Sequence, residues 1–229
     1  MTHLSALATD FDGTLAREGV VDQEVINTLA DFRASGRRVM LVTGRTMPSL
    51  FHVFPKVDAF DLVVAENGAT LYDPRKKLEK PLAQAPSSRF TSVLTERGVA
   101  VLETGRVIVS TTAVHHDAVA AAIRDLQLAL RIVMNRESLM VLPEGVSKAT
   151  GLQAAAAELG LNLSEIAGIG DAENDQAFLS ACELSAAVQN ALPELKRHVK
   201  LVTRNAYGAG VVEFISHIAA QDLSGQFRK

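Results

Sequence analysis

The stretch ATDFDGTL, residues 8–15, places two aspartates where an apolar run reaches a glycine. Asp10 and Asp12 stand on either side of a phenylalanine, and a chain that only finished a strand and turned would not need two negative charges there. Taken alone, a carboxylate at a strand end is often a turn former or a helix cap. The meaning of this pair therefore depends on which other polar residues the fold brings beside it.

Short apolar runs and helical patterns alternate on both sides of the middle of the chain. The pattern predicts a strand over residues 4–10 and a helix over residues 22–36, where apolar residues recur at helical intervals. The same alternation predicts strands at 37–45, 60–69, 166–171, 184–188 and 199–203, and helices at 47–54, 148–160, 173–182, 192–198 and 208–221. Such alternation is typical of an α/β fold with a doubly wound, mainly parallel sheet.

The middle of the chain breaks this rhythm. An expected hairpin over residues 69–78 is followed by KPLAQAPSS, residues 80–88, whose composition indicates a linker. Beyond it the pattern predicts helices at 89–97 and 117–130 and strands at 99–103, 107–112, 131–135 and 138–142. Adjacent strands without an intervening helix pair antiparallel. We therefore predict that residues 82–145 form a smaller α+β module, of order αββαββ, inserted into a core of residues 1–81 and 146–229.

Composition narrows the classes of protein and of partner. The 229 residues are 48% hydrophobic and 21% charged, which is typical of a globular chain with a sizeable core. A formal net charge of −3 provides no basic field for a phosphate backbone, so nucleic acid is not an expected partner. The single cysteine, Cys182, excludes an internal disulfide framework and fits a reducing compartment. Since no uncharged apolar run reaches the ~18 residues of a membrane span, we expect a cytoplasmic protein with no membrane partner.

Polar residues follow several of the expected strands. They are Asp10 and Asp12 after the first, Thr43, Gly44 and Arg45 after the second, Glu66 and Asn67 after the third, and Asp171, Asn174 and Asp175 after the strand at 166–171. In an open parallel sheet the ligand lies beyond the carboxyl ends of the strands, so these clusters are predicted to share one rim. Clustered carboxylates repel one another unless a cation lies among them, and oxygen ligands from several loops suit Mg²⁺. The sequence therefore predicts a metal site.

Each cluster also has a simpler interpretation. GDAEND, residues 170–175, is an acceptable helix start in which Asp171 would be the cap, and TGR and ENGA are acceptable turns. Lys148 fits the simple interpretation less well, because it begins an expected helix where the macrodipole disfavours a cation. An anionic partner would explain its position. The shared rim favours a functional site over a set of unrelated turns.

The motifs resemble those of a known family. DFDGT, VTGR, the isolated Lys148 in GVSKATGL, and GDAENDQAF resemble, in order and separation, the four motifs of the haloacid dehalogenase superfamily of phosphohydrolases. ENGA and the place of the insert resemble the Cof-like or IIB subgroup, which carries a C2-type cap, and the short module is similar to the cap of small phosphoglycolate phosphatases. The resemblance covers essentially the whole chain. It implies a Rossmann-like core and a Mg²⁺-dependent phosphomonoesterase acting on a small phosphorylated metabolite, such as a sugar phosphate or phosphoglycolate.

The resemblance also implies a role for each motif residue. Asp10 would be the nucleophile that forms an aspartyl phosphate, and Asp12 the general acid and then the general base. Mg²⁺ would be held by Asp10, by the main-chain carbonyl of Asp12 and by Asp171. The residues implied to bind the substrate phosphate are Thr43, Gly44, Arg45, Lys148 and Asn174, with Asp175 and Asn67 in support.

Two other classes of function share parts of this pattern. A phosphomutase of the phosphomannomutase type uses a similar core and cap, and a phospho-receiver or regulatory protein also places acids, a threonine and a lysine around Mg²⁺. The Asp10 and Asp12 spacing and the inserted module disfavour a receiver. Candidates for contacts with the rest of the substrate are the polar residues of the module, Arg106, Arg131, Asn135 and Arg136.

Overall fold

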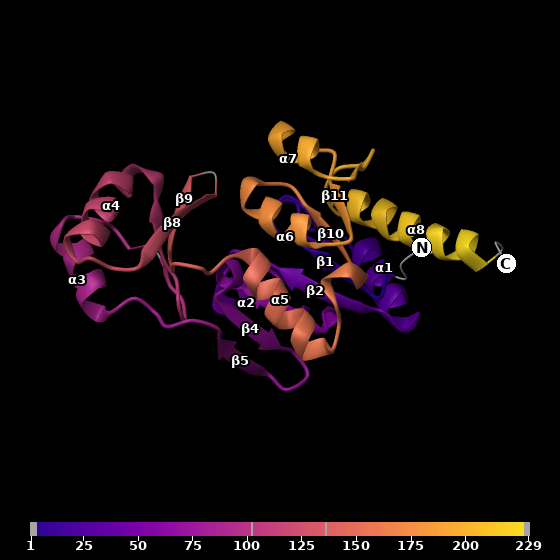
Figure 1. The fold of residues 1–229 in the computed structure, drawn as a ribbon, viewed down its shortest axis with the longest axis horizontal. Coiled ribbons are helices and arrows are strands. Elements are labelled where there is room, and N and C mark those ends of the chain that lie inside the picture. Colours follow the sequence, from indigo (N-terminus) through magenta and orange to yellow (C-terminus); the bar gives the residue numbers. More distant parts are fainter. Residues whose placement is uncertain (1–3, 102, 136, 227–229) are drawn as a thin grey trace.

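The computed structural model describes residues 4–101, 103–135 and 137–226, whose strands form two sheets (Figure 1). The larger sheet has eight strands in the order β12-β11-β10-β1-β2-β3-β4-β5. Its strands are β1 Ala6–Thr9, β2 Arg38–Val42, β3 Leu62–Ala65, β4 Thr70–Asp73, β5 Leu78–Pro81, β10 Ile166–Gly170, β11 Leu184–Ala187 and β12 Leu201–Val202. Strands β12 to β3 of this order pair parallel, and β4 and β5 form the expected hairpin. The predicted α/β fold with a mainly parallel sheet is confirmed.

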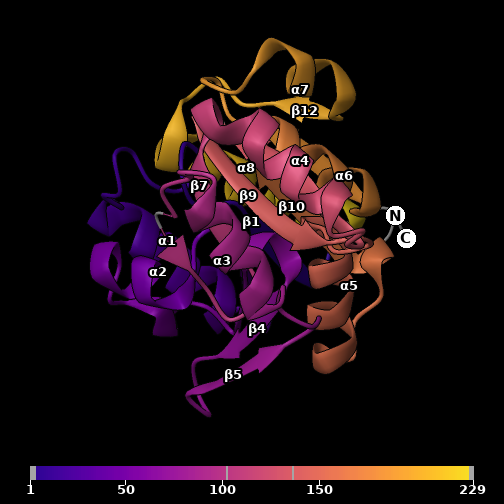
Figure 2. The ribbon, with the colours of Figure 1, turned by 90° about the vertical axis from the view of Figure 1, so that its left-hand side faces the viewer.

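Helices cover both faces of the larger sheet. They are α1 Gln23–Ala34, α2 Met47–Val53, α5 Lys148–Leu159, α6 Gln176–Ala181, α7 Pro193–His198 and α8 Tyr207–Gln226. Figure 2 shows α1 and α2 on one side of the sheet and α5 and α6 on the other. Within the described part of the chain, no helix combines the length and the apolar character needed to span a membrane.

The strand β1 lies in the middle of the larger sheet, and all four of its residues are buried. It pairs parallel with β2 on one side and with β10 on the other, so Thr9 lies beside both Leu41 and Ile169. The chain order therefore reverses between β1 and β10. In open α/β sheets such a switch point opens a crevice at the carboxyl ends of the strands, where ligands bind.

The smaller sheet is antiparallel and has the order β6-β7-β9-β8. Its strands are β6 Glu103–Thr104, β7 Val109–Thr112, β8 Leu130–Asn135 and β9 Ser138–Pro143, and its helices are α3 Ser88–Glu96 and α4 His116–Asp125. Alternate residues of a strand face opposite sides. In β9, Leu139 and Val141 pack in the cluster formed with α3 and α4, whereas Met140 and Leu142 pack with Ala69 of the larger unit. Figure 1 accordingly shows α3 and α4 on the outer side of this sheet.

Several expected elements of the module are shorter in the structure. The helix expected over residues 117–130 ends at Asp125, because Gln127 has a left-handed backbone with φ 51° and Leu130 already begins β8. The strand expected over residues 107–112 begins only at Val109. The strand expected over residues 99–103 is reduced to β6, and residue 102 lies outside the described residues.

The turn after β3 is pressed against the start of α5. Asn67 and Gly68 have positive φ angles of 52° and 98°. A Cβ atom on Gly68 would lie 1.9 Å from the carbonyl oxygen of Ser147, and one on Gly151 would lie 2.5 Å from the Cα of Gly68. Only glycine allows these backbones to approach so closely, and the approach fixes the position of Lys148 at the first residue of α5.

We expect Gly68→Ala to destabilise the protein much more than Gly36→Ala. Both glycines have positive φ, 98° and 89°, but no atom lies within 4 Å of a Cβ built on Gly36. The left-handed backbone alone costs alanine about 1 kcal/mol, and overpacking adds about 1–3 kcal/mol at Gly68. Urea unfolding of both variants measures the difference. Equal losses would show that the close approach to Ser147 is relaxed in solution.

Candidate functional site

The loops after β1, β2, β3 and β10 meet at the switch point. The backbone N–H of Asp10 donates to Ile169, and that of Asn67 donates to the carbonyl of Thr43. The sequence-derived residues that these loops and α5 bring together in the interior are Asp10, Thr43, Asn67, Lys148, Asp171 and Asp175. The convergence of polar side chains from distant segments on one rim is therefore a feature of the structure.

Lys148 lies at the centre of this group. Its ammonium donates to Asp10 Oδ1 at 2.5 Å and to Asp175 Oδ1 at 2.6 Å. Burial by itself would lower the pKa of Lys148, but the charges of Asp10 and Asp175 outweigh burial and raise it, so the side chain stays protonated. The first turn of α5 is held by a capping box between Ser147 and Thr150, whose two reciprocal hydrogen bonds fix the end from which Lys148 projects.

Three carboxylates cluster beside this lysine, one after β1 and two after β10. Ligand oxygens of Asp10, Asp171 and Asp175 all lie within 4.8 Å of one another. Burial, followed by the negative charge of Asp175, raises the pKa of Asp10 well above its usual range, against the opposing effect of Lys148. A divalent cation would balance the net charge of three carboxylates and one ammonium, and hard carboxylate oxygens are the donors that Mg²⁺ prefers. The donor set therefore fits such an ion.

Asp175 and Thr14 hold the loop that follows β10. Asp175 Oδ2 accepts the backbone N–H groups of Asp171 at 2.8 Å and Ala172 at 3.0 Å. The turn is thus capped by Asp175, whereas the simpler interpretation of the sequence gave that task to Asp171. The Thr14 hydroxyl donates to Asp171 Oδ1 at 3.2 Å. The sequence analysis gave no role to Thr14, although it is the last residue of the DFDGT motif.

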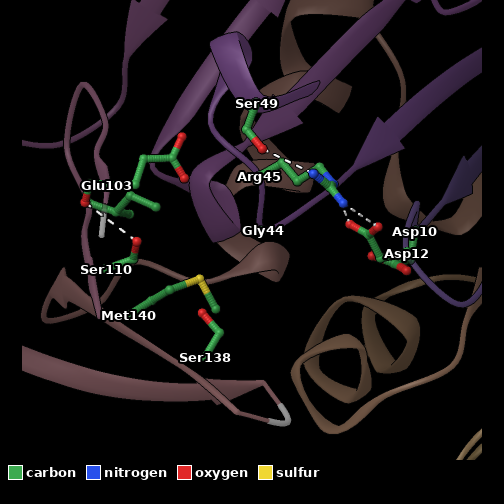
Figure 3. A pocket seen from close by; sticks show the side chains of 10 residues that line it. Asp10, Asp12, Gly44, Arg45, Ser49, Glu103, Ser110, Ser138 and Met140 are labelled. Atoms are coloured by element: carbon green, nitrogen blue, oxygen red, sulfur yellow. Dashed lines mark hydrogen bonds and ion pairs between the residues drawn. The ribbon is translucent and has the colours of Figure 1, made fainter. Parts of the chain in front are cut away.

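Asp12 has a different environment from Asp10. Strand β1 ends at Thr9, and the side chain of Asp12 is 40% exposed. The Arg45 guanidinium donates Nε to Oδ2 at 2.7 Å and Nη2 to Oδ1 at 2.8 Å, and its other terminal nitrogen donates to Ser49 (Figure 3). Such a paired contact fixes the plane of the carboxylate. One acid of the opening pair is therefore buried against an ammonium, and the other is open and oriented by a guanidinium.

A cavity of about 260 Å³ lies between the larger unit and the inserted module. The larger unit contributes Asp10, Asp12, Gly44, Arg45 and Ser49, and the module contributes Glu103, Ile108, Ser110, Ser138 and Met140. Figure 3 shows the two groups facing each other across the cavity, with Arg45 and Asp12 at one end. The sequence analysis missed every module residue of this wall, because the wall depends on how the two units dock.

Asn67 connects the wall to the loops beneath it. Its amide donates to Met140 Sδ at 2.9 Å and accepts from Asn174 Nδ2 at 3.1 Å. A Cβ atom on Gly44 would lie 3.3 Å from the Asn67 amide nitrogen. Asn174, predicted to bind phosphate, lines a second cavity together with Lys148 and Arg131.

Arg106 and Arg131, two of the module residues predicted to reach the substrate, do not line the first cavity. Arg106 pairs with Glu79 at 3.1 Å on the surface, and Arg131 lines the second cavity. Arg136 and the side chain of Asn135 lie outside the described residues. Among the described side chains, the polar groups of the module that face the first cavity are Glu103, Ser110 and Ser138.

The chain is similar to known proteins over almost its whole length. A family model described as haloacid dehalogenase-like hydrolase matches residues 7–117 and 101–215. A phosphoglycolate phosphatase of Methanothermobacter thermautotrophicus is 28% identical over 218 residues, which cover 93% of this chain and 97% of the relative. Thermoplasma acidophilum 0175 has a similar crystal structure, with a TM-score of 0.82, 19% identity and coverage of 95% of this chain and 99% of that one. A HAD subclass IIB sugar phosphatase gives a TM-score of 0.76 at 17% identity, over 94% of this chain and 99% of its own.

We expect Asp10→Asn to match or exceed the wild type in free energy of unfolding at pH 7 when both are free of metal. The raised pKa of Asp10 means that its ionisation destabilises the folded state, and this cost appears as the pH rises above about 4, the ordinary pKa of Asp. The advantage of the variant should therefore grow between pH 4 and pH 7. Urea unfolding at several pH values measures it.

Asp61→Asn is the control, because its expected pH dependence has the opposite sign. Burial tends to raise the pKa of Asp61, but the N–H of Val39 and the guanidinium of Arg33 lower it below its usual value. Its contribution is present above the ordinary pKa of Asp and is lost as the pH falls through the lowered value. Asp61→Asn should lower the free energy of unfolding by about 3 kcal/mol at pH 7 and by less at acidic pH. A large loss for Asp10→Asn at pH 7 would contradict the assignment of Asp10 as a destabilising buried charge.

Proposed function

Because this chain belongs to the haloacid dehalogenase-like hydrolase family and is a phosphatase, we propose that it hydrolyses a small phosphomonoester through an aspartyl phosphate on Asp10. The observation that carries the proposal is the position of Asp10, which lines the cavity while its Oδ1 is held by Lys148 at 2.5 Å. Asp12 lines the same cavity. The proposed nucleophile, which is bound to a buried ammonium, and the proposed acid therefore border one small space.

In the first step, a carboxylate oxygen of Asp10 attacks phosphorus, and the bond from phosphorus to the ester oxygen breaks. Asp12 gives its proton to the departing alkoxide, which leaves as an alcohol. In the second step, Asp12 removes a proton from the water that attacks the aspartyl phosphate, and inorganic phosphate leaves with Asp10 restored. Asp12 is partly exposed at the cavity, where it can reach the leaving group and water, and its paired contact with Arg45 opens before one of its oxygens carries the proton.

Lys148 and Thr43 are the proposed contacts for the phosphoryl oxygens. Phosphoryl transfer depends mainly on positioning and on charge stabilisation, which a buried ammonium supplies without rearrangement. The oxygen of the Thr43 hydroxyl accepts the N–H of Arg45 at 3.1 Å, so its hydrogen remains able to donate toward the substrate. Gly44 and Arg45 border the same space and are proposed to complete the phosphate site, whereas Asn174 supports it through Asn67.

Asp10, Asp171 and the main-chain carbonyl of Asp12 are the residues that would hold Mg²⁺. The fit rests on the buried cluster of carboxylate oxygens around Asp10 and Asp171. When bound, the ion would neutralise part of the charge that opposes the approach of an anionic ester to an anionic nucleophile. Asp175 keeps Lys148 and the Asp171 loop in place.

The cavity supports a small substrate with polar groups beyond the phosphate. Its volume of about 260 Å³ lies below the range of about 300–1,000 Å³ that is common for drug-sized ligands. Ser110 and Ser138 offer hydroxyl groups on the module side. Relatives described as a phosphoglycolate phosphatase and a sugar phosphatase point to the same size range, so we propose a small phosphorylated acid or sugar as the substrate class.

We expect exhaustive chelation to abolish phosphate release from a panel of small phosphorylated metabolites, and added Mg²⁺ to restore it. Asp171→Asn, which removes one carboxylate from the proposed site, should raise the Mg²⁺ concentration for half-maximal activity by about 10–100-fold. Asp73→Asn on the far hairpin is the control, and its activity should depend on the Mg²⁺ concentration as that of the wild type does. Full activity after chelation would remove the metal from the proposal.

We expect Lys148→Ala to lower kcat/KM for every substrate by a similar factor of about 100 or more, since it touches only the phosphoryl group that all substrates share. Ser138→Ala should instead change the ranking of substrates by up to about tenfold, because leaving groups differ in their contacts with the module. The measurement is kcat/KM for several esters and for p-nitrophenyl phosphate, with thermal unfolding as the folding control. If Lys148→Ala changed the order of the substrates, the proposed division, with chemistry in the larger unit and specificity in the module, would be wrong.

A further inference from the structure

Glu66, from the turn after β3, reaches out of the larger unit into the inserted module. Its side chain is completely buried. Oε1 accepts the backbone N–H of Arg106 at 2.8 Å, and Oε2 accepts those of Val107 at 2.8 Å and Ile108 at 2.9 Å. Three consecutive backbone N–H groups of the module thus converge on one carboxylate from the other unit.

The two partners are shaped for each other. A Cβ atom on Gly105 would lie 2.5 Å from the carboxyl carbon of Glu66, so the module turn needs glycine at this position. The turn is closed by the N–H of Gly105, which donates to Ile108 at 2.9 Å. Glu66 itself has a φ of 53°, a left-handed conformation that is unusual and costly for glutamate. A strained residue kept in place by the contacts around it is a mark of function.

The electrostatics favour the docked arrangement. Successive backbone N–H groups form a concave site for an anion, and hydrogen bonds to a charged acceptor are about twice as strong as neutral ones. A carboxylate buried without such partners would be strongly unfavourable, so Glu66 penalises partial separation of the two units. An apolar cluster between the two units excludes water but does not fix their relative orientation; it includes Ala69, Val107, Ile108, Met140 and Leu142.

The turn held by Glu66 continues directly into the wall of the cavity. Ile108 donates its N–H to Glu66, and its side chain lines the cavity, as does that of Ser110 two residues later. Because one carboxylate fixes the start of this strand, it also fixes how far the wall lies from Asp10 and Asp12. Glu66 does not itself line the cavity.

We propose that Glu66 is a positioning residue that anchors the module over the catalytic loops and thereby sets the leaving-group side of the cavity. It acts through the backbone of residues 106–108 and touches neither phosphate nor leaving group. The kinetic part of this inference rests on the proposed phosphatase function, whereas the anchoring part does not. The loss of the anchor should therefore affect substrates that depend on the wall more than an ester with an undemanding leaving group.

The test compares Glu66→Gln with Arg106→Ala. Glutamine keeps the shape but loses the charge and has only one acceptor oxygen, so its NH2 group faces at least one of the three N–H groups and the anchor is weakened. Arg106→Ala removes the side chain, which is 65% exposed, and its ion pair with Glu79, but keeps the backbone N–H that Glu66 accepts. Hydrogen exchange of the amides of residues 106–108 should accelerate by about tenfold or more in Glu66→Gln and stay unchanged in Arg106→Ala.

Kinetics then separate positioning from a general structural role. In Glu66→Gln, KM for the preferred metabolite should rise more than kcat falls, while kcat/KM for p-nitrophenyl phosphate should change less than about twofold. Wild-type exchange rates in Glu66→Gln would overturn the anchor. Faster exchange together with an equal loss of kcat/KM for every ester would overturn the role of Glu66 in setting the cavity wall. If the wild type hydrolyses no ester, the proposed function fails, and the exchange rates still decide the anchor.

A second variant approaches the same contact from the module. Gly105→Ala drives a methyl group toward the carboxylate while leaving the charge of Glu66 in place. It should reproduce the faster exchange, and the double variant with Glu66→Gln should be less than additive, because both changes break one contact. Additive effects on exchange would show that Gly105 and Glu66 act separately, which would contradict the proposed contact.

Discussion

A buried ammonium joins the two halves of the α/β core. Lys148 is held between Asp10, which follows β1, and Asp175, which follows β10, so segments separated by 138 and 27 residues meet on one charge. A lysine this deep is tolerable only while both carboxylates stay near it, and three acids this close are tolerable only with a cation among them. The arrangement can therefore persist only if the loops after β1 and β10 and the start of α5 keep their places together.

The sheet topology supplies the place where such a cluster can form. Strands β1 and β10 are neighbours, and the chain moves away from them in opposite directions, so the loops after both strands diverge and leave a crevice. Asp10 and Asp171 enter this crevice from its two sides. The inserted module then covers the crevice, with alternate residues of β9 facing its own helices and the larger unit.

Much of this arrangement follows from the sequence. The carboxyl ends of parallel strands share one edge of a sheet, and each polar cluster in the sequence follows the end of an expected strand. The contact between Lys148 and Asp175 was expected only through the family resemblance, since their 27-residue separation carries no local signal. Glu66 was placed on the rim, but its contact with the module was not predicted, and the wall residues Glu103 and Ser110 were not found, because these contacts depend on the docking of two units. Likewise, the left-handed backbone after the second module helix could not be predicted, because that position is occupied by Gln127 and not by a glycine.

The turn after β3 links the inserted module to the loops around Lys148. Glu66 holds the module turn, Asn67 contacts Met140 of the wall and Asn174 of the β10 loop, and Gly68 lets the start of α5 approach. Three successive residues thus connect the module, the loop after β10 and the start of α5. A movement of the module that shifted this turn would also shift the residues around Lys148. Under the proposed function, docking of the module and completion of the phosphoryl site would be linked through this turn, whereas a wall residue such as Ser138, outside the turn, would be free to vary without disturbing the chemistry.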